Sequence, residues 1–216
     1  MKNKLAFTLA EVLVTLGIIG VVSAMTVPTL MQNYQRQSYV TQLHKTYNEI
    51  SQALLRYQTD RNAINLTEAG LTSQDAVNNF ITTYFKNVKE CDTMNNCFAS
   101  SYKAMDGGTI NNYTVNVKSY VFASGVSIRP LYDKVGAKLV NIGIDINGQK
   151  GPNIGGRDLF FFCVYNNGVI DDLPIDENTV APMTSAERDT QFANYCNSSA
   201  FGCFGKILND NWQMTY

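Results

Sequence analysis

The sequence has few charged side chains and a single histidine. Charged residues make up 16% of the 216 residues, and the formal net charge is −1. The chain therefore lacks a basic field that would hold nucleic acid by its phosphates, and it lacks an acidic tail. The only histidine, His44, lies in a stretch with helical spacing, so no Ser-His-Asp or Cys-His catalytic arrangement is supported. We expect a protein that is not an enzyme.

The cysteines do not have the CxxC spacing of a zinc site. Cys91 and Cys97 enclose the letters DTMNN, and Cys196 and Cys203 enclose NSSAFG. Behind an N-terminal segment of the export type, two short-range pairs in loop-like sequence are typical of local disulfides; free thiols and a metal site are the alternatives. The fifth cysteine, Cys163, stands in the strand-like run DLFFFCVY and is expected to be a buried thiol.

The N-terminus combines two lysines with a long apolar segment. Residues 12–31 contain no charged side chain, and a helix of this length spans about 30 Å, the thickness of a bilayer's hydrocarbon core. A secretory signal peptide cleaved after Ala24 is one interpretation, and a plain membrane anchor is another. Neither accounts for Glu11 inside the apolar segment, because a carboxylate held near the middle of a bilayer costs about 3 kcal/mol.

The letters KLAFTLAE, residues 4–11, resemble the processing site of type IV prepilins and type II secretion pseudopilins. The resemblance implies that residues 1–6 are a basic leader that stays in the cytoplasm. It also implies that prepilin peptidase cuts between Ala6 and Phe7 and methylates the new amine of Phe7. Ala6 stands where the family usually has glycine.

The same resemblance assigns a partner to Glu11. An ionisable side chain inside a membrane is expected to meet an opposite charge. In the resemblance, Glu11 of one subunit faces the positive amine of Phe7 on a neighbour, and this contact sets the axial register of an open filament. Pro28 falls where the family usually has a proline that loosens the helix. Residues 7–31 are thus expected to form a hydrophobic transmembrane and assembly helix.

Apolar residues continue at helical spacing beyond the charge-free run. They are Val40, Leu43, Tyr47, Ile50, Leu54 and Tyr57. Alternating steps of three and four place them on one stripe of an amphipathic helix. We therefore expect one helix from about residue 8 to residue 57, interrupted near Pro28, in which residues 32–58 are an amphipathic continuation that packs against a globular head.

Residues 59–216 are expected to form this head, with an α+β fold. A helix cap at 72–75 precedes a short helix over 77–85, and capping-box spacing predicts another over 184–195. Strand-like alternation or a hairpin turn occurs at residues 113–117, 119–131, 140–146 and 158–170. These segments predict an antiparallel sheet of four to six strands, with one apolar face covered by the amphipathic helix and with Trp212 and Tyr216 packed against it. The pilin resemblance implies the same layout.

Two groups of acidic side chains remain. The first is a glycine-rich turn whose oxygen-bearing residues are Asp145, Asn147, Asn153 and Asp158. These residues are a possible Ca²⁺ loop, and the alternative is a tight turn in which they bond their own backbone. The second group is Asp171, Asp172, Asp176 and Glu177, for which we expect a solvated loop. No other cofactor is expected.

The pattern as a whole favours a structural subunit of a pseudopilus or pilus that serves type II protein secretion. The resemblance implies prepilin peptidase, other pilin subunits and an inner-membrane assembly platform as partners. No direct partnership with nucleic acid is expected. The pilin resemblance further implies a single pass through the inner membrane, with the head on the extracytoplasmic side. The alternative is a membrane-tethered or secreted binding protein that has an ordinary anchor or signal peptide.

Overall fold

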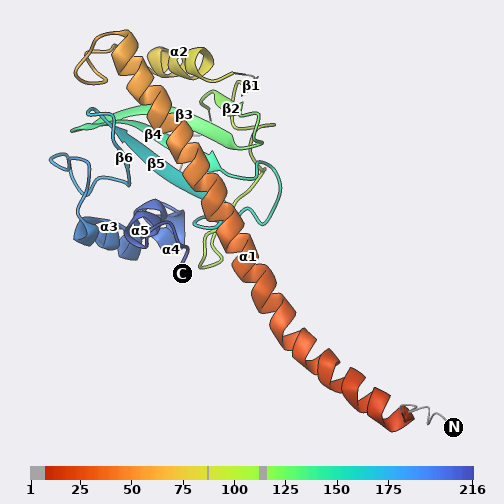
Figure 1. Cartoon of the computed structure of the whole chain (residues 1–216). Coiled ribbons are helices and arrows are strands. Elements are labelled where there is room, and N and C mark those ends of the chain that lie inside the picture. The colour runs from red at the N-terminus through yellow and green to blue at the C-terminus, as the bar shows by residue number, and fades with distance from the viewer. Residues whose placement is uncertain (1–7, 87, 112–115) are drawn as a thin grey trace. The chain divides into compact units, whose positions relative to one another are not determined.

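Figure 1 shows the computed structural model of the chain, which describes residues 8–86, 88–111 and 116–216. The expected cleavage residues Ala6 and Phe7 lie outside the described residues, as do Tyr113 and Val115 of the expected strand over 113–117. The chain divides into two compact units, of which the first ends at Ser38 and the second is Tyr39–Tyr216.

The first helix, α1 (Leu9–Asp60), is continuous for 52 residues. The expected interruption near Pro28 is therefore wrong: helical structure runs through the proline, which gives up only the hydrogen bond that its missing N–H would donate to the carbonyl of Ala24. Side chains of α1 are exposed from Leu9 to Gln35. Within the second unit, the buried side chains of α1 are Val40, Leu43, Thr46, Ile50, Ala53, Leu54 and Tyr57, which confirms the predicted stripe except for half-buried Tyr47.

A single antiparallel meander forms the sheet of the second unit. Its six strands are β1 (Lys89–Cys91), β2 (Ser119–Val121), β3 (Ser127–Val135), β4 (Lys138–Asp145), β5 (Leu159–Tyr165) and β6 (Ile170–Asp171), and they neighbour one another in chain order. Both predicted hairpins are present. Their turns contain Gly125 (φ +86°) and Gly168 (φ +82°), in the left-handed region that glycine adopts without strain.

One face of this sheet is covered by helices. Phe162 of β5 contacts the ring of Tyr47 on α1, with centroids 6.3 Å apart, and the ring of Phe204, at 4.1 Å. The helix α2 (Gln74–Tyr84) begins as predicted, with the Ser73 hydroxyl accepting a hydrogen bond from the Ala76 N–H at 3.2 Å. Figure 1 shows α2 near β3 and the C-terminal helices near β5 and β6. The α+β layout expected from the sequence is confirmed.

The other face of the sheet is also buried, which the sequence did not predict. Every residue of β4 and β5 is buried, so the apparent polar face of β4, with Asn141 and Asp145, does not meet water. The irregular segment 91–110 supplies this second cover. Its buried side chains, including Phe98 and Tyr102, form an apolar cluster with Leu159 and Phe161 of β5.

The C-terminal region contains more helix than expected. Thr184 and Glu187 make the predicted capping box of α3 (Ser185–Gln191), which continues as a π-helical turn (Phe192–Cys196) and α4 (Asn197–Ser199). A further helix, α5 (Cys203–Asn209), was not predicted. Trp212 packs against the core cluster that includes the apolar face of the sheet. Its ring stacks on His44 of α1, with centroids 3.9 Å apart, and lies 6.0 Å from the ring of Phe204 in α5.

Candidate functional site

The amino end of α1 carries a reciprocal capping box between Thr8 and Glu11. The Glu11 carboxylate oxygen Oε2 accepts hydrogen bonds from the Thr8 backbone N–H and from its hydroxyl, both at 2.8 Å. The Glu11 N–H donates in return to the Thr8 hydroxyl at 3.3 Å. The T-x-x-E spacing is readable in the sequence, but the prepilin resemblance assigned Glu11 only a contact between subunits. Glu11 thus already has a role within its own chain, and that role uses only one of its oxygens.

A long apolar surface follows this cap. Residues 12–31 are all exposed, and by length and composition α1 can cross a membrane. Side chains such as Leu13 and Ile19, 60% and 61% exposed, need a lipid or protein environment. The structure does not bring the expected assembly residues Glu11 and Pro28 together, since 17 residues of helix separate them by about 25 Å.

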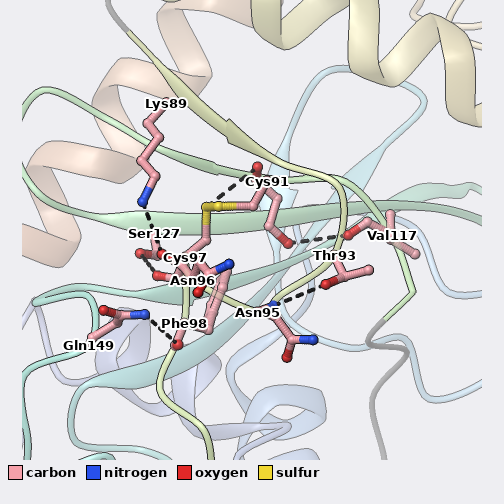
Figure 2. The surroundings of a disulfide bond; sticks show 11 residues. Lys89, Cys91, Thr93, Asn95, Asn96, Cys97, Phe98, Val117, Ser127 and Gln149 are labelled. Atoms are coloured by element: carbon pink, nitrogen blue, oxygen red, sulfur yellow. Dashed lines mark hydrogen bonds between the residues drawn. A yellow bond between two sulfur atoms is a disulfide. The ribbon is translucent and has the colours of Figure 1, made fainter.

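Both predicted disulfides are present, Cys91–Cys97 with Cα atoms 6.2 Å apart and Cys196–Cys203 at 4.8 Å. Figure 2 shows how the first is anchored: the Ser127 hydroxyl of β3 donates to the Cys97 carbonyl, and the Gln149 amide donates to the Phe98 carbonyl at 3.2 Å. This disulfide therefore fixes the start of the irregular cover to the sheet.

Cys163 is the free cysteine of the described residues, and it is buried as expected. Burial raises the pKa of its thiol far above the ordinary range, so the side chain stays protonated and unreactive. Its place in β5, among Tyr165 and Ala181, is that of a core residue.

The structure brings the four residues of the glycine-rich turn into one cluster, at the loop between β4 and β5. The Asp158 carboxylate accepts hydrogen bonds from the backbone N–H groups of Asn153 at 2.7 Å and Ile154 at 2.6 Å. Asp145 accepts one from the Asn147 N–H at 3.2 Å and one from the Tyr102 hydroxyl. Both carboxylates are fully buried. Burial raises the pKa of Asp145 to about 7, against the opposing effect of the bond from Tyr102.

These hydrogen bonds explain how the turn holds its shape, but two of its side-chain oxygen atoms have no donor among the described residues. The side-chain oxygens of Asn147 and Asn153 are buried and accept no hydrogen bond from the described residues. No ion pair in the described ranges includes Asp145 or Asp158, and the same ranges hold no group of three or more His, Cys, Asp or Glu side chains suited to a metal. Two buried carboxylates and two orphaned amide oxygens nevertheless fit the all-oxygen ligation that Ca²⁺ prefers.

The second acidic group is only partly the solvated loop that we expected. Asp171 and Asp172 are fully buried, so the expectation is wrong for them. Asp171 makes a two-pronged ion pair with Arg188 of α3, with N–O distances of 2.8 and 2.7 Å. Asp172 accepts hydrogen bonds from the N–H groups of Gly202 at 3.1 Å and Gly205 at 2.6 Å, at the amino end of α5. These two carboxylates hold the C-terminal helices on the sheet.

Comparison with known proteins identifies the N-terminal segment. Residues 1–27 match the family model described as the prokaryotic N-terminal methylation motif. No curated protein and no solved structure matches the chain significantly. The matched residues contain the Thr8–Glu11 cap and more than half of the charge-free run, so the motif and the exposed apolar helix are one continuous feature. The chain therefore carries the prepilin-type methylation segment characteristic of type IV pilins and pseudopilins, which are structural rather than catalytic subunits.

Proposed function

We propose that this chain is a pilin-like structural subunit that is assembled through α1 into a pseudopilus or pilus for type II protein secretion. The observation that carries the proposal is the methylation motif over residues 1–27, continuous with an exposed helix that is free of charge over residues 12–31. The two disulfides support an extracytoplasmic head behind a single pass through the inner membrane, because disulfides persist in oxidising compartments.

Processing follows from the motif. Prepilin peptidase removes the leader, residues 1–6, by cutting between Ala6 and Phe7, and then methylates the amine of Phe7. The product consists of the assembly helix over 7–31, its amphipathic continuation over 32–58 and the head over 59–216. In the sequence, Phe7 directly precedes Thr8, whose backbone N–H and hydroxyl bond Glu11.

The capping geometry supports a contact between Glu11 and the amine of a neighbouring subunit. Both of its capping bonds use Oε2, and Oε1 accepts no hydrogen bond from the described residues. In a bilayer or a filament core, a carboxylate with one free oxygen is stabilised by a cation. The amine of Phe7 on the next copy supplies that cation, and the pairing sets the stagger of neighbouring α1 helices.

The test separates the cap from the charge. Glu11→Gln keeps an oxygen that can accept from Thr8 but removes the charge, whereas Thr8→Ala keeps the charge and removes the two capping bonds that use the Thr8 hydroxyl. We expect Glu11→Gln to be cleaved at Phe7 yet to lose filament incorporation at least about tenfold, as expected for a lost buried ion pair. Thr8→Ala should assemble close to the wild-type level. The readouts are the mass of the mature N-terminus and the yield of sheared filaments.

Two results would contradict this proposal. A mature chain that begins at Met25 would indicate an ordinary signal peptide, and equal filament assembly of Glu11→Gln and wild type would indicate a simple tether. In either case the head would be a membrane-tethered or secreted binding protein.

We also propose that the loop between β4 and β5 binds Ca²⁺ through Asp145, Asn147, Asn153 and Asp158. The support is the pair of buried amide oxygens without donors beside two buried carboxylates. An ion at this position would stabilise the loop, and no step of filament assembly requires it.

A further inference from the structure

The second unit has a groove that none of the roles above uses. It has a volume of about 320 Å³ and lies between α1, the residues that end α2 and the turn after β2. Lys45, Glu49 and Arg56 line it from α1, and Phe85, Lys86 and Phe122 line it from the other side. A volume of this size is enough for one or two side chains of a partner.

The groove combines positive charge with an aromatic floor. Of its charged residues, only Lys45 and Glu49 face each other, with nitrogen and oxygen 3.8 Å apart. No ion pair within the described ranges includes Arg56 or Lys86. The rings of Phe85 and Phe122 stack with centroids 4.6 Å apart. A matching ligand carries two carboxylates beside an apolar side chain.

The chain presents such a ligand in the loop between β6 and α3. Asp176 and Glu177 are exposed, and they lie between two exposed apolar residues, Ile175 at 46% and Val180 at 63%. This combination is unusual in the second unit, where few large apolar side chains of the described residues are so exposed. We call residues 175–180 the acidic loop.

The acidic loop is held in shape by its own contacts. The Thr179 hydroxyl accepts hydrogen bonds from the N–H groups of Ile175 and Asp176, both at 3.1 Å. The carbonyl of Glu177 rests against Gly136 so closely that a Cβ at Gly136 would collide with it. A preformed loop loses little conformational entropy when it docks.

The groove and the acidic loop belong to opposite edges of the sheet. Phe122 directly follows β2, beside the edge strand β1, whereas the acidic loop follows β6, the strand at the other edge. Figure 1 shows β1 and β2 at one side of the sheet and β6 at the other. Complementary surfaces at opposite edges join copies in a row, since such a contact is heterologous and does not close by two-fold symmetry.

We propose that the acidic loop of one copy docks in the groove of a second copy of this chain. Asp176 and Glu177 face Arg56 and Lys86, and Ile175 covers the Phe85–Phe122 stack. The contact rests on the proposed function, because it joins the heads of subunits that α1 brings together. The charge signs and the apolar pairing also fix which copy follows which.

Crosslinking of full-length chains tests the contact directly. Two tagged copies are expressed in one membrane, one with Glu177→Cys and the other with Lys86→Cys, and are treated with a short bismaleimide. We expect a crosslinked pair that carries both tags. The matched control replaces Glu177→Cys by Ala186→Cys, which places an exposed cysteine on α3 and should give at most about a tenth of that product.

Charge reversal tests the chemistry. The double change Asp176→Lys and Glu177→Lys should lower the filament yield roughly tenfold, since attraction becomes repulsion. Adding Arg56→Glu and Lys86→Glu to the same chain should restore most of the yield. All four side chains are exposed, but the Asp176 carboxylate also accepts hydrogen bonds within the loop from the Asn178 N–H at 2.9 Å and the Thr179 hydroxyl at 3.2 Å. Glu177→Lys alone therefore serves as the variant that reverses charge without breaking these bonds, and an unchanged melting temperature of each variant confirms folding.

The outcomes separate this contact from the proposed function. Filaments with a methylated Phe7 but without the 177–86 crosslink overturn the contact and leave the proposed function standing. The crosslink in chains that keep an unmethylated terminus supports the contact and contradicts the proposed function. The changes Arg56→Glu and Lys86→Glu are also made alone. If they lower the filament yield while Asp176→Lys and Glu177→Lys do not, the groove binds another partner, and the inference is overturned.

Discussion

At the scale of single residues, the head depends on carboxylates that are buried in different ways. Asp171 has a cation, Arg188, while Asp158 and Asp172 are satisfied mainly by backbone N–H groups. Asp145 accepts from one backbone N–H and from the Tyr102 hydroxyl. A charge inside a protein is tolerated only with such partners. When one partner is removed, the group that stays buried carries its full desolvation cost without compensation. These residues looked alike in the sequence, yet each has different consequences when it is changed.

The ion pair of Asp171 should be the most sensitive of the salt bridges to truncation. Asp171→Ala leaves the largely buried guanidinium of Arg188 unpaired and removes the acceptor of the Met183 N–H. We expect the free energy of unfolding to fall by about 3–5 kcal/mol. The control is Lys45→Ala, which breaks an exposed pair and should cost under about 1 kcal/mol. Urea unfolding monitored by circular dichroism measures both, and similar losses would show that Asp171 is not paired as described.

Calcium binding can be measured by thermal unfolding of the full chain in detergent. We expect 1–5 mM Ca²⁺, about a hundred times the dissociation constant of a moderate site, to stabilise the protein by up to about 3 kcal/mol relative to a chelator. Asp158→Asn should abolish this shift, and Asp176→Asn, an exposed change, should retain it. A melting temperature that is equal with Ca²⁺ and with chelator would show that the loop is held by hydrogen bonds alone.

At the scale of elements, periodic segments were predictable and irregular ones were not. The stripe on α1, the two hairpins and the caps at Ser73 and Thr184 rest on local patterns, and the structure confirms them, with Tyr47 of the stripe half-buried. The short helix α5 contains Gly205 and spans only seven residues, too few for a clear period. The cover formed by segment 91–110 has no period at all, so the burial of both faces of β5 could not be read from its letters.

Gly136, in the turn between β3 and β4, lies against the acidic loop and offers a test. Its φ is +54°, and an added Cβ would collide with the backbone of Glu177. Gly107 also has a positive φ, +90°, but an added Cβ would meet nothing within 4 Å. Both changes to alanine cost about 1–2 kcal/mol for the left-handed backbone. Gly136→Ala should cost about 1–3 kcal/mol more, because the acidic loop must move.

Chemical denaturation of the two variants measures this difference. Equal losses of unfolding free energy would mean that the acidic loop does not rest on the turn. The preformed shape on which its docking depends would then lack support.

At the scale of the whole molecule, the buried carboxyls determine how stability depends on pH. Burial raises the pKa of both Asp145 and Asp172 to about 7, well above the value near 4 of an unfolded chain. The folded state therefore binds more protons than the unfolded state between these values. The stabilising effect is fully present below about pH 4 and is lost as the pH rises through about 7.

We therefore expect the melting temperature to fall between pH 5 and pH 8. Asp172→Asn, which cannot ionise, should flatten this dependence, while Asp189→Asn on the exposed face of α3 should not. Differential scanning calorimetry in buffers of constant ionic strength measures the effect. A melting temperature that rises over this range would show that the N–H donors around Asp172, rather than burial, dominate its titration.

The sequence by itself determined the N-terminal segment, because a prepilin-type segment is recognised by an apolar run and by one charge at a definite place. It also predicted the disulfide pairs, against the alternatives of free thiols and a metal site, and most of the strands, whose signals are local. Only the tertiary structure decided that Asp171 and Asp172 are buried and that both faces of the sheet are covered. These features depend on contacts between residues far apart in the chain or on the choice among partners, and no local pattern specifies either.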